Sequence, residues 1–336
     1  ALTGDTLRSD DLAAALEVIA VEGPDAMYRG TIGQALAADM VARGGLVTAL
    51  DLAEYAPAVR ASVPVRLRDW TMHTNPPPSI GGPVLAAMLS LLARTDYHPG
   101  HPEDVARLVA IQRAVLDHRR DVLDVAEDLD AAGRELLEMV DRGWDPVAQA
   151  SASTVHVSAV DENGVACATT ASAGYGSGVT VPGTGILLNN CLGEPELNRR
   201  GVHALAPGTR LGSNMAPSVA RRSDGTVLAI GSPGADRITT ALLQVIGAYA
   251  LGGLDLQAAV DTPRLHLRHV EDAHGRPSLR IDHEADLQVP DLGLPTYEHP
   301  SSSMFFGGVA GALSLPDGTL SAAADPRRAA AVAVSA

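Results

Sequence analysis

The sequence of 336 residues contains no lysine and very few aromatic side chains. Its 25 arginines stand against 40 acidic residues, which gives a net charge of −15 at pH 7. Because no basic stripe is present, we expect neither nucleic acid nor a membrane surface as a partner. Aromatic residues make up only 3% of the chain, so the core must be filled by the abundant Ala, Val and Leu residues.

Cysteines and long apolar runs are also scarce. Cys167 and Cys191 are too few for a disulfide scaffold, and we expect two reduced, mostly buried thiols. No run of about 18 apolar residues occurs, so no transmembrane helix is expected. No signal peptide is recognisable in this stretch of sequence, which favours the cytoplasm. A hydrophobic content of 46% still suffices for a substantial core.

Helical patterns dominate the first 150 residues. Apolar periodicity predicts helices at 10–20, capped by Ser9 or Asp10, at 32–43, closed by Gly44, and at 102–118. Asn75-Pro-Pro-Pro-Ser-Ile-Gly-Gly82 is interpreted as a rigid loop, because proline removes hydrogen-bond donors and glycine permits positive φ.

Short β-type segments follow after about residue 150. The turn sequences at 161–164, 223–225 and 316–318 each lie between two strand-like runs, and one long helix is expected at 238–251. Helices followed by hairpins indicate an α+β architecture.

The first of these hairpins brings hydroxyl groups together at its open end. Thr154, His156 and Ser158 share one face of the first strand. Depending on the turn, Ala171 or Ala173 is opposite Thr154, so Ser172 lies within one residue of that position. Paired Thr and Ser residues are also common in purely structural roles, so the pattern alone is consistent with either a catalytic or a structural role for Thr154 and Ser172. His156 is expected to be a structural, hydrogen-bonded histidine.

A series of motifs resembles the small subunit of the γ-glutamyltransferase family, in the family's order. It comprises Thr154-Val-His-Val-Ser-Ala-Val-Asp161, Gly185-Ile-Leu-Leu-Asn-Asn190, Gly231-Ser-Pro-Gly234 with Arg237-Ile238, and Ala324-Asp-Pro-Arg327. Upstream, 23–30 and 76–82 resemble the end of the large subunit, and Thr262-Pro-Arg264 with His266 adds another match.

The resemblance implies the αββα sandwich of the N-terminal nucleophile (Ntn) hydrolases, in which two stacked, mainly antiparallel sheets are flanked by helices. Residues 1–153 would form a mostly helical, large-subunit-like region and 154–336 a catalytic, small-subunit-like region, together one structural unit. The front part of the large subunit has no counterpart before Ala1, so this is either part of a longer polypeptide or a shortened homologue. In the second case, another chain or a homodimer would have to cover the exposed core face.

The family's chemistry implies self-cleavage between Ser153 and Thr154, leaving the two fragments as a heterodimer. The new α-amine of Thr154 can then serve as base for its own hydroxyl, which is otherwise a weak nucleophile. Ser172 would orient this amine. The backbone N–H groups of Gly234 and Ala235 would stabilise the oxyanion, with alanine standing where the family has a second glycine.

The substrate pocket departs from the family pattern. The implied substrate-binding residues are Gly174, Tyr175, Asn190, Cys191, Glu194, Ser213 and Asn214. The 173–176 segment lacks the family's asparagine, and Cys191 follows Asn190 where the family has an acid or amide. A site built for a charged γ-glutamyl group would reject it when such contacts are lost. The sequence therefore indicates an acyl or amide substrate without identifying its acyl group.

Three functions follow. The first is an amide-cleaving hydrolase or acyltransferase. The second is a hydrolase of a carbon–carbon bond next to a carbonyl, as in some natural-product relatives, and the third is a non-catalytic homologue. No metal or organic cofactor is expected, because His266 and His269 form only a weak HxxH run on a predicted strand. Family members are often periplasmic or secreted, which opposes the cytoplasmic expectation.

Overall fold

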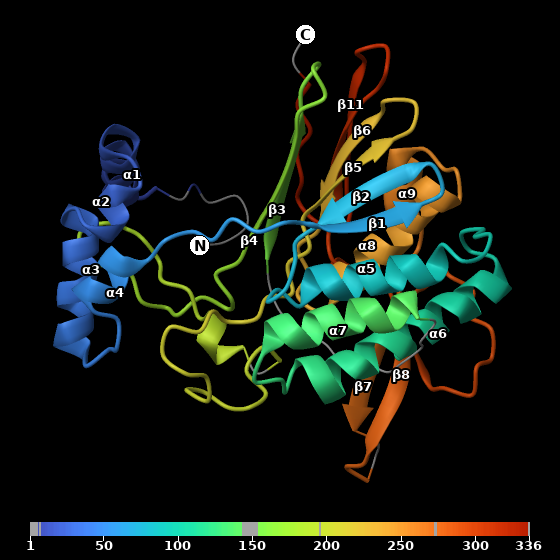
Figure 1. Ribbon diagram of the computed structural model, residues 1–336, viewed down its shortest axis with the longest axis horizontal. Helices are drawn as coiled ribbons and strands as arrows, with labels where there is room; N and C mark the ends of the chain where they lie inside the picture. Colours follow the sequence, from blue (N-terminus) through green and yellow to red (C-terminus); the bar gives the residue numbers. More distant parts are fainter. Residues whose placement is uncertain (1–5, 7, 143–153, 195, 272–273, 335–336) are drawn as a thin grey trace. The chain divides into compact units, whose positions relative to one another are not determined.

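The computed structural model describes residues 6, 8–142, 154–194, 196–271 and 274–334. The described chain divides into two compact units (Figure 1). One consists of residues 1–60 and 175–190, and the other of 61–174 and 191–336.

The smaller unit is helical. It contains α1 (Asp10–Glu22), α2 (Asp25–Tyr28), α3 (Thr31–Arg43) and α4 (Ala49–Glu54). The Ser9 hydroxyl caps α1 by accepting from the N–H of Leu12, and Gly44 closes α3 in the left-handed conformation, as the sequence predicts. Gly185 packs against α1, because a Cβ at this position would lie 2.7 Å from the Leu12 nitrogen. The 175–190 segment is thereby fixed to these helices.

The larger unit is built on a six-stranded sheet, whose order is β1-β2-β5-β6-β10-β11 and whose neighbours are all antiparallel. Its strands are β1 (Val63–Leu67), β2 (Trp70–Thr74), β5 (Ser218–Arg222), β6 (Val227–Gly231), β10 (Ala310–Ser314) and β11 (Leu320–Ala324). β1 and β2 were not expected in the mainly helical first half. They form because Val65, Leu67, Trp70 and Met72 alternate toward a buried face.

Helices cover one face of this sheet. They are α5 (Gly81–Leu92), α6 (Pro102–His118) with a π turn over Arg119–Leu123, α7 (Leu129–Asp141), α8 (Arg237–Ile246) with a π turn over Gly247–Leu251, and α9 (Leu256–Asp261). α5 is the central helix, in contact with α6, α7, α8 and β1. Twelve residues long and almost wholly buried, it forms the centre of the hydrophobic core.

The loop interpretation of 75–82 is partly wrong, because Gly81 and Gly82 begin α5. Neither glycine has positive φ. They are required for close approach instead, since a Cβ would lie 2.1 Å from the Asn214 carbonyl oxygen at Gly81 and 1.8 Å from the Asn75 carbonyl oxygen at Gly82.

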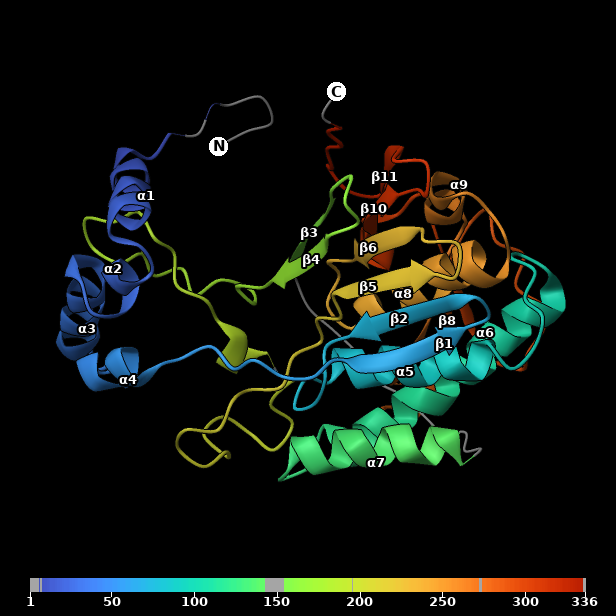
Figure 2. The ribbon, with the colours of Figure 1, turned by 45° about the horizontal axis from the view of Figure 1, so that its top comes forward.

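A hairpin of β3 (Val155–Val160) and β4 (Ala166–Ala171) packs on the other face of the sheet, against β6 and β10 (Figure 2). Its inner face carries His156 and Ser158, whereas Val155 and Val157 point outward and are each 65% exposed. In the described chain, this hairpin represents the second layer of the sandwich, and its outer apolar face is open.

A smaller sheet of β7 (Leu265–Glu271), β8 (Pro277–Glu284) and β9 (Thr296–His299) completes the larger unit. β7 and β8 are antiparallel, and β9 runs parallel to β8. Short helical turns lie at Cys191–Gly193 and Met304–Phe306. All three predicted turns connect antiparallel strand pairs, and the expected α+β class is confirmed.

Candidate active site

Thr154 lies immediately before β3 and is 8% exposed. The hairpin pairs Val155 with Ala171 and Val160 with Ala166, so the next position of this register sets Thr154 opposite Ser172. Both registers considered from the sequence were therefore wrong by one residue, in opposite directions. The turn decides this, because the Asp161 N–H donates to the Val165 carbonyl.

The hydroxyls of Thr154 and Ser172 differ in their contacts. Ser172 Oγ accepts a hydrogen bond of 3.1 Å from the Gly174 N–H. Thr154 makes no side-chain hydrogen bond to another residue of the described chain. A largely buried hydroxyl at a strand end, where the ladder stops, is available for chemistry.

Residues 143–153 lie outside the described residues. Of the two residues that flank the expected cleavage bond, the structure therefore describes Thr154 and not Ser153.

His156 anchors this end of the hairpin to the sheet. A Cβ on Gly231 would lie 2.2 Å from the imidazole ring, so only glycine leaves room for it. His156 Nε2 bonds Ser158 Oγ at 2.8 Å, and Ser158 donates to the Ala310 carbonyl at 3.2 Å. Burial lowers the pKa of His156 to about 4, so the ring is neutral near pH 7. The expectation of a structural histidine agrees with these contacts.

The loop after β6 carries the expected oxyanion donors. Gly234 has φ +131° and Ala235 has φ +67°, and both residues are buried. Gly234 touches Gly307, since a Cβ would lie 2.7 Å from that Cα. Neither backbone N–H has an acceptor among the described residues. Buried N–H groups without acceptors are rare in proteins, so this pair is a candidate anion site.

Asp236 directly follows Gly234 and Ala235 and stays ionised. Burial raises its pKa, but the charge of Arg237 and the hydrogen bond from His266 outweigh this effect and lower it. Arg237 Nη1 lies 2.5 Å from one carboxylate oxygen and His266 Nε2 lies 3.2 Å from the other. Thr240 Oγ1 bonds the other ring nitrogen of His266 at 3.0 Å. This buried group was missed from the sequence, although it adjoins the Gly-Ser-Pro-Gly motif.

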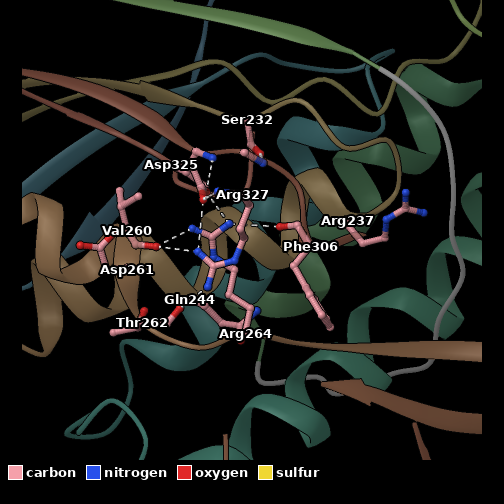
Figure 3. A network of polar contacts seen from close by, with 12 residues as sticks. Ser232, Arg237, Gln244, Val260, Asp261, Thr262, Arg264, Phe306, Asp325 and Arg327 are labelled. Atoms are coloured by element: carbon pink, nitrogen blue, oxygen red, sulfur yellow. Dashed lines mark hydrogen bonds and ion pairs between the residues drawn. The ribbon is translucent and has the colours of Figure 1, made fainter. Parts of the chain in front are cut away.

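A buried ion-pair network supports the segment against which Gly234 packs (Figure 3). Arg264 Nη1 lies 2.7 Å from Asp325 Oδ2 and donates to the Phe306 carbonyl at 3.1 Å. Arg327 bonds Glu284 at 2.5 Å and Asp325 at 3.2 Å. All four side chains are at most 1% exposed. The motifs that contain Arg264 and Arg327 thus hold the 306–309 backbone, on which Gly234 rests.

Acidic side chains gather in the segment that begins at Cys191. Burial raises the pKa values of Cys191 and Glu194, so the thiol is a poor nucleophile. Burial also raises the pKa of Glu196 to about 7. Glu196 is 6% exposed, and its Oε1 has no hydrogen-bond partner in the described part of the chain. No sequence signal distinguished Glu196 from a surface acid.

The other expected pocket residues divide between the units. Tyr175 and Asn190 belong to the smaller unit, whereas Gly174, Ser213 and Asn214 belong to the larger one. The Ser213 carbonyl accepts from the N–H groups of Ile80 and Gly81, both at 2.9 Å. The structure therefore joins the Pro-rich segment to Ser213 and Asn214, and it leaves Tyr175 56% exposed.

Cys167 and Cys191 are both free thiols, as expected. Cys167 is exposed and Cys191 only half-buried, so the expectation of mostly buried thiols is wrong. Cys167 lies on the outward face of the hairpin.

Within the described residues, no three potential metal ligands of the types His, Cys, Asp and Glu come together. His266 and His269 are three positions apart on β7, and such side chains point to opposite faces of a strand. A search of the described helices finds none whose length and apolar character would allow it to span a bilayer.

The layered arrangement is similar to the crystal structure of cephalosporin acylase from Bacillus halodurans. The TM-score is 0.73 at 20% sequence identity, over 96% of this chain and 62% of that one. This likeness concerns the fold, which is that of the Ntn hydrolases, and it confirms the expected fold class.

Sequence comparison gives the family. A sequence model described as gamma-glutamyltranspeptidase matches residues 1–335, so the chain belongs to the gamma-glutamyltranspeptidase family. It is 28% identical to the glutathione hydrolase proenzyme of Escherichia coli K12, over 96% of this chain and 61% of that protein. It is 34% identical to the acylase ACY 1 proenzyme of Pseudomonas sp. SE83, over 78% of this chain and 50% of that protein. The chain thus spans between half and about three fifths of these relatives' length.

Proposed function

We propose that this protein is a self-processing hydrolase or acyltransferase that cleaves an amide through an acyl-enzyme on Thr154. The observation that carries this proposal is the position of Thr154: largely buried, without a side-chain hydrogen bond in the described chain, and at the strand end opposite Ser172. Membership of a family whose relatives are named glutathione hydrolase and acylase proenzymes supports it.

The nucleophile and the oxyanion donors are proposed to act in one region of the sheet. His156 packs on Gly231, at the end of β6, and Thr154 lies two residues before His156, about 7 Å along the strand. Gly234 lies three residues beyond Gly231. A substrate carbonyl at this place can meet both the Thr154 hydroxyl and the N–H groups of Gly234 and Ala235.

The proposed reaction proceeds in two stages. After cleavage before Thr154, its free α-amine takes the hydroxyl proton as Oγ1 attacks the amide carbon, and the negative charge on the carbonyl oxygen is held by the two N–H groups. Collapse breaks the C–N bond, and the departing amine takes up the proton. Water, or an amine acceptor, then attacks the acyl ester and regenerates Thr154. Ser172 is proposed to orient the α-amine.

The two fragments are proposed to remain associated as a heterodimer. β2 lies before the cleavage point and β5 lies after it, yet they pair along five residues of one sheet, from Trp70 with Arg222 to Thr74 with Ser218. α5 likewise packs its buried side chains against α8. Separation would expose the central core, which hydrophobic burial opposes.

The substrate is proposed to be an acyl or amide compound other than a simple γ-glutamyl group. Cys191 stands where an acid or amide is expected, and burial raises the pKa values of Glu194 and Glu196, which favours their neutral forms more than in water. Such a pocket offers weaker attraction to a substrate ammonium group than ionised carboxylates would.

Intact-mass measurement of the purified protein tests the proposal. We expect a split into residues 1–153 and 154–336, a single uncut chain for Thr154→Ala, and a slower split for Thr154→Ser, which keeps a hydroxyl. A wild-type chain that stays whole under folding conditions contradicts the proposal. Turnover of γ-glutamyl anilides can then be compared with that of aliphatic acyl amides and carbon–carbon substrates, to identify the bond that is cleaved.

A further inference from the structure

The 191–194 segment lies beside the end of the hairpin at which Thr154 is placed. The Cys191 thiol donates a long hydrogen bond to the Ser172 carbonyl, with the sulfur 3.9 Å from the oxygen. Ser172 follows β4 and is opposite Thr154 in the register of the hairpin. An acyl group on Thr154 would therefore lie close to this segment, so the conformation of the segment decides which side chains surround the acyl group.

Regular secondary structure does little to fix this segment. It contains one short 3₁₀ turn, Cys191–Gly193, in which the Glu194 N–H donates to the Cys191 carbonyl at 3.3 Å. The Leu197 N–H then donates to the Glu194 carbonyl at 3.1 Å. Hydrogen bonds in a 3₁₀ turn have poor geometry, so the shape of such a turn depends on the side chains that bond its carbonyls.

Asn198 supplies these side-chain bonds. Its Nδ2 lies 3.1 Å from the Cys191 carbonyl oxygen, 3.0 Å from that of Leu192 and 3.1 Å from that of Glu194. A side-chain amide has two N–H donors, so the three carbonyls share them. One side chain thus fixes the backbone at three of the four residues of the segment. An aspartate of the same shape would face these carbonyls with a negative charge and no donor.

The next residue, Arg199, connects the segment to the helical layer. Arg199 Nε donates to Asp124 Oδ2 at 2.8 Å, and Arg119 Nε donates to Asp124 Oδ1 at 3.0 Å. The side chains of Asp124 and Arg119 are fully buried, and that of Arg199 is 24% exposed. A buried carboxylate held by a buried guanidinium group is a firm anchor, because separating the two would leave each charge uncompensated.

Arg200, the following residue, has a different kind of partner. Its Nη2 lies 2.9 Å from Glu127 Oε1, and the Glu127 side chain is 86% exposed. Ion pairs with exposed partners contribute little to stability or to local order. Arg199 and Arg200 are therefore a matched pair of neighbouring arginines, of which the first bonds a buried anchor and the second a surface acid.

We propose that Asn198 and Arg199 are positioning residues that hold the 191–194 segment in the conformation that selects the acyl group transferred to Thr154. This inference rests on the proposed acyl-enzyme function and extends it to two residues outside those that the family resemblance implies. Neither side chain touches the reacting atoms in this proposal. Their loss should therefore weaken recognition of the acyl group, which raises KM, and leave the chemistry at Thr154 intact.

The test compares the full wild-type chain with Asn198→Asp, Asn198→Gln, Arg199→Gln and the control Arg200→Gln. Intact mass reports self-cleavage before Thr154. Hydrolysis is then measured with γ-glutamyl, glutaryl and hexanoyl p-nitroanilides, whose acyl groups are zwitterionic, anionic and neutral. p-Nitrophenyl acetate serves as a substrate whose small acyl group makes few contacts beyond the reacting atoms.

The expected effect is on KM for the anilide that wild type cleaves fastest. Asn198→Asp should raise this KM by at least about tenfold and Arg199→Gln by about fivefold, with kcat changed by less than about threefold. Asn198→Gln keeps the amide donors and should recover part of the loss. Arg200→Gln should match wild type, and all variants should cleave themselves and hydrolyse p-nitrophenyl acetate as wild type does.

This pattern, with equal thermal unfolding temperatures, supports the inference. Unchanged KM values in Asn198→Asp and Arg199→Gln overturn it, and so does a parallel loss of p-nitrophenyl acetate hydrolysis, which would show a merely structural role. A wild-type chain that is cut but cleaves none of the anilides also overturns it. A wild-type chain that stays uncut contradicts the proposed function itself, whereas a cut, active chain with unaffected variants contradicts this inference alone.

Discussion

Replacing Asp325 by asparagine is expected to destabilise this protein far more than removing any exposed charge. The Asp325 carboxylate accepts from Arg264 at 2.7 Å, from Arg327 at 3.2 Å, and from the Val309 N–H at 2.7 Å. Burial lowers the pKa of Arg264 to about 10, and the Asp325 charge opposes that effect. The asparagine variant leaves two buried guanidinium groups with Glu284 as their one close carboxylate.

The magnitude follows from the burial of the network. Breaking a buried ion pair by removing one partner costs about 3–5 kcal/mol, because the remaining charge is desolvated without compensation. Total stabilities are about 5–15 kcal/mol, so the loss is a large share. With an m-value of about 3 kcal/mol/M in urea, the midpoint should fall by about 1–1.7 M.

The assay is equilibrium urea unfolding, followed by circular dichroism in a Thr154→Ala background, which keeps the chain single under the proposed function. Glu138→Gln is the control, because this carboxylate pairs with Arg142 at 2.7 Å on the surface of α7, with exposed fractions of 62% and 73%. Exposed pairs contribute little to stability. A midpoint shift for Asp325→Asn no larger than that of Glu138→Gln would refute the reasoning.

Three further outcomes follow from buried groups. The pKa of His156 is lowered to about 4 in the folded protein, so between pH 6.5 and 4 the unfolded state binds a proton that the folded state does not. The free energy of unfolding should therefore fall by up to about 3 kcal/mol as pH drops through this range. In urea unfolding at different pH values, His156→Gln should show a flatter pH dependence. The pKa of Glu196 is raised to about 7, so its ionisation lowers the free energy of unfolding as pH rises above 4.5. Glu196→Gln should therefore be about 1–3 kcal/mol more stable than wild type at pH 8, and this difference should shrink toward pH 5. Equal pH slopes for variant and wild type would contradict either statement. Gly82→Ala should lose about 1–3 kcal/mol in thermal unfolding, since its Cβ would meet the Asn75 carbonyl at 1.8 Å, and a variant as stable as wild type would show that this contact can relax.

Much of the local structure could be predicted from the sequence, because it depends on neighbours along the chain. The helices at Asp10–Glu22 and Pro102–His118 follow from apolar periodicity and acidic or polar first turns. The three hairpin turns follow from their Asp and Gly residues. The strands of residues 63–74 were missed because they are short and because β5, which pairs with β2, is about 150 residues away.

The candidate site divides in the same way. The motif series predicted Thr154 and Gly234, and the hairpin spacing predicted that Ser172 lies near Thr154. It could not predict the register, which the hydrogen bond across the turn sets. Nor could it show that Gly81 and Gly82 begin a helix, since their close neighbours come from other segments.

The sequence by itself determined the family, the fold class and the residue proposed as nucleophile, because the motifs and turn residues that carry them are local in the chain. Only the tertiary structure decided which groups are buried together. Glu196, Asp236 and the network of Arg264, Asp325 and Arg327 look like ordinary charged residues until folding removes them from water. Likewise, β1 and β5 lie in one sheet only because both pair with β2, which places Arg66 and Arg221, 155 residues apart in the chain, on one face of that sheet.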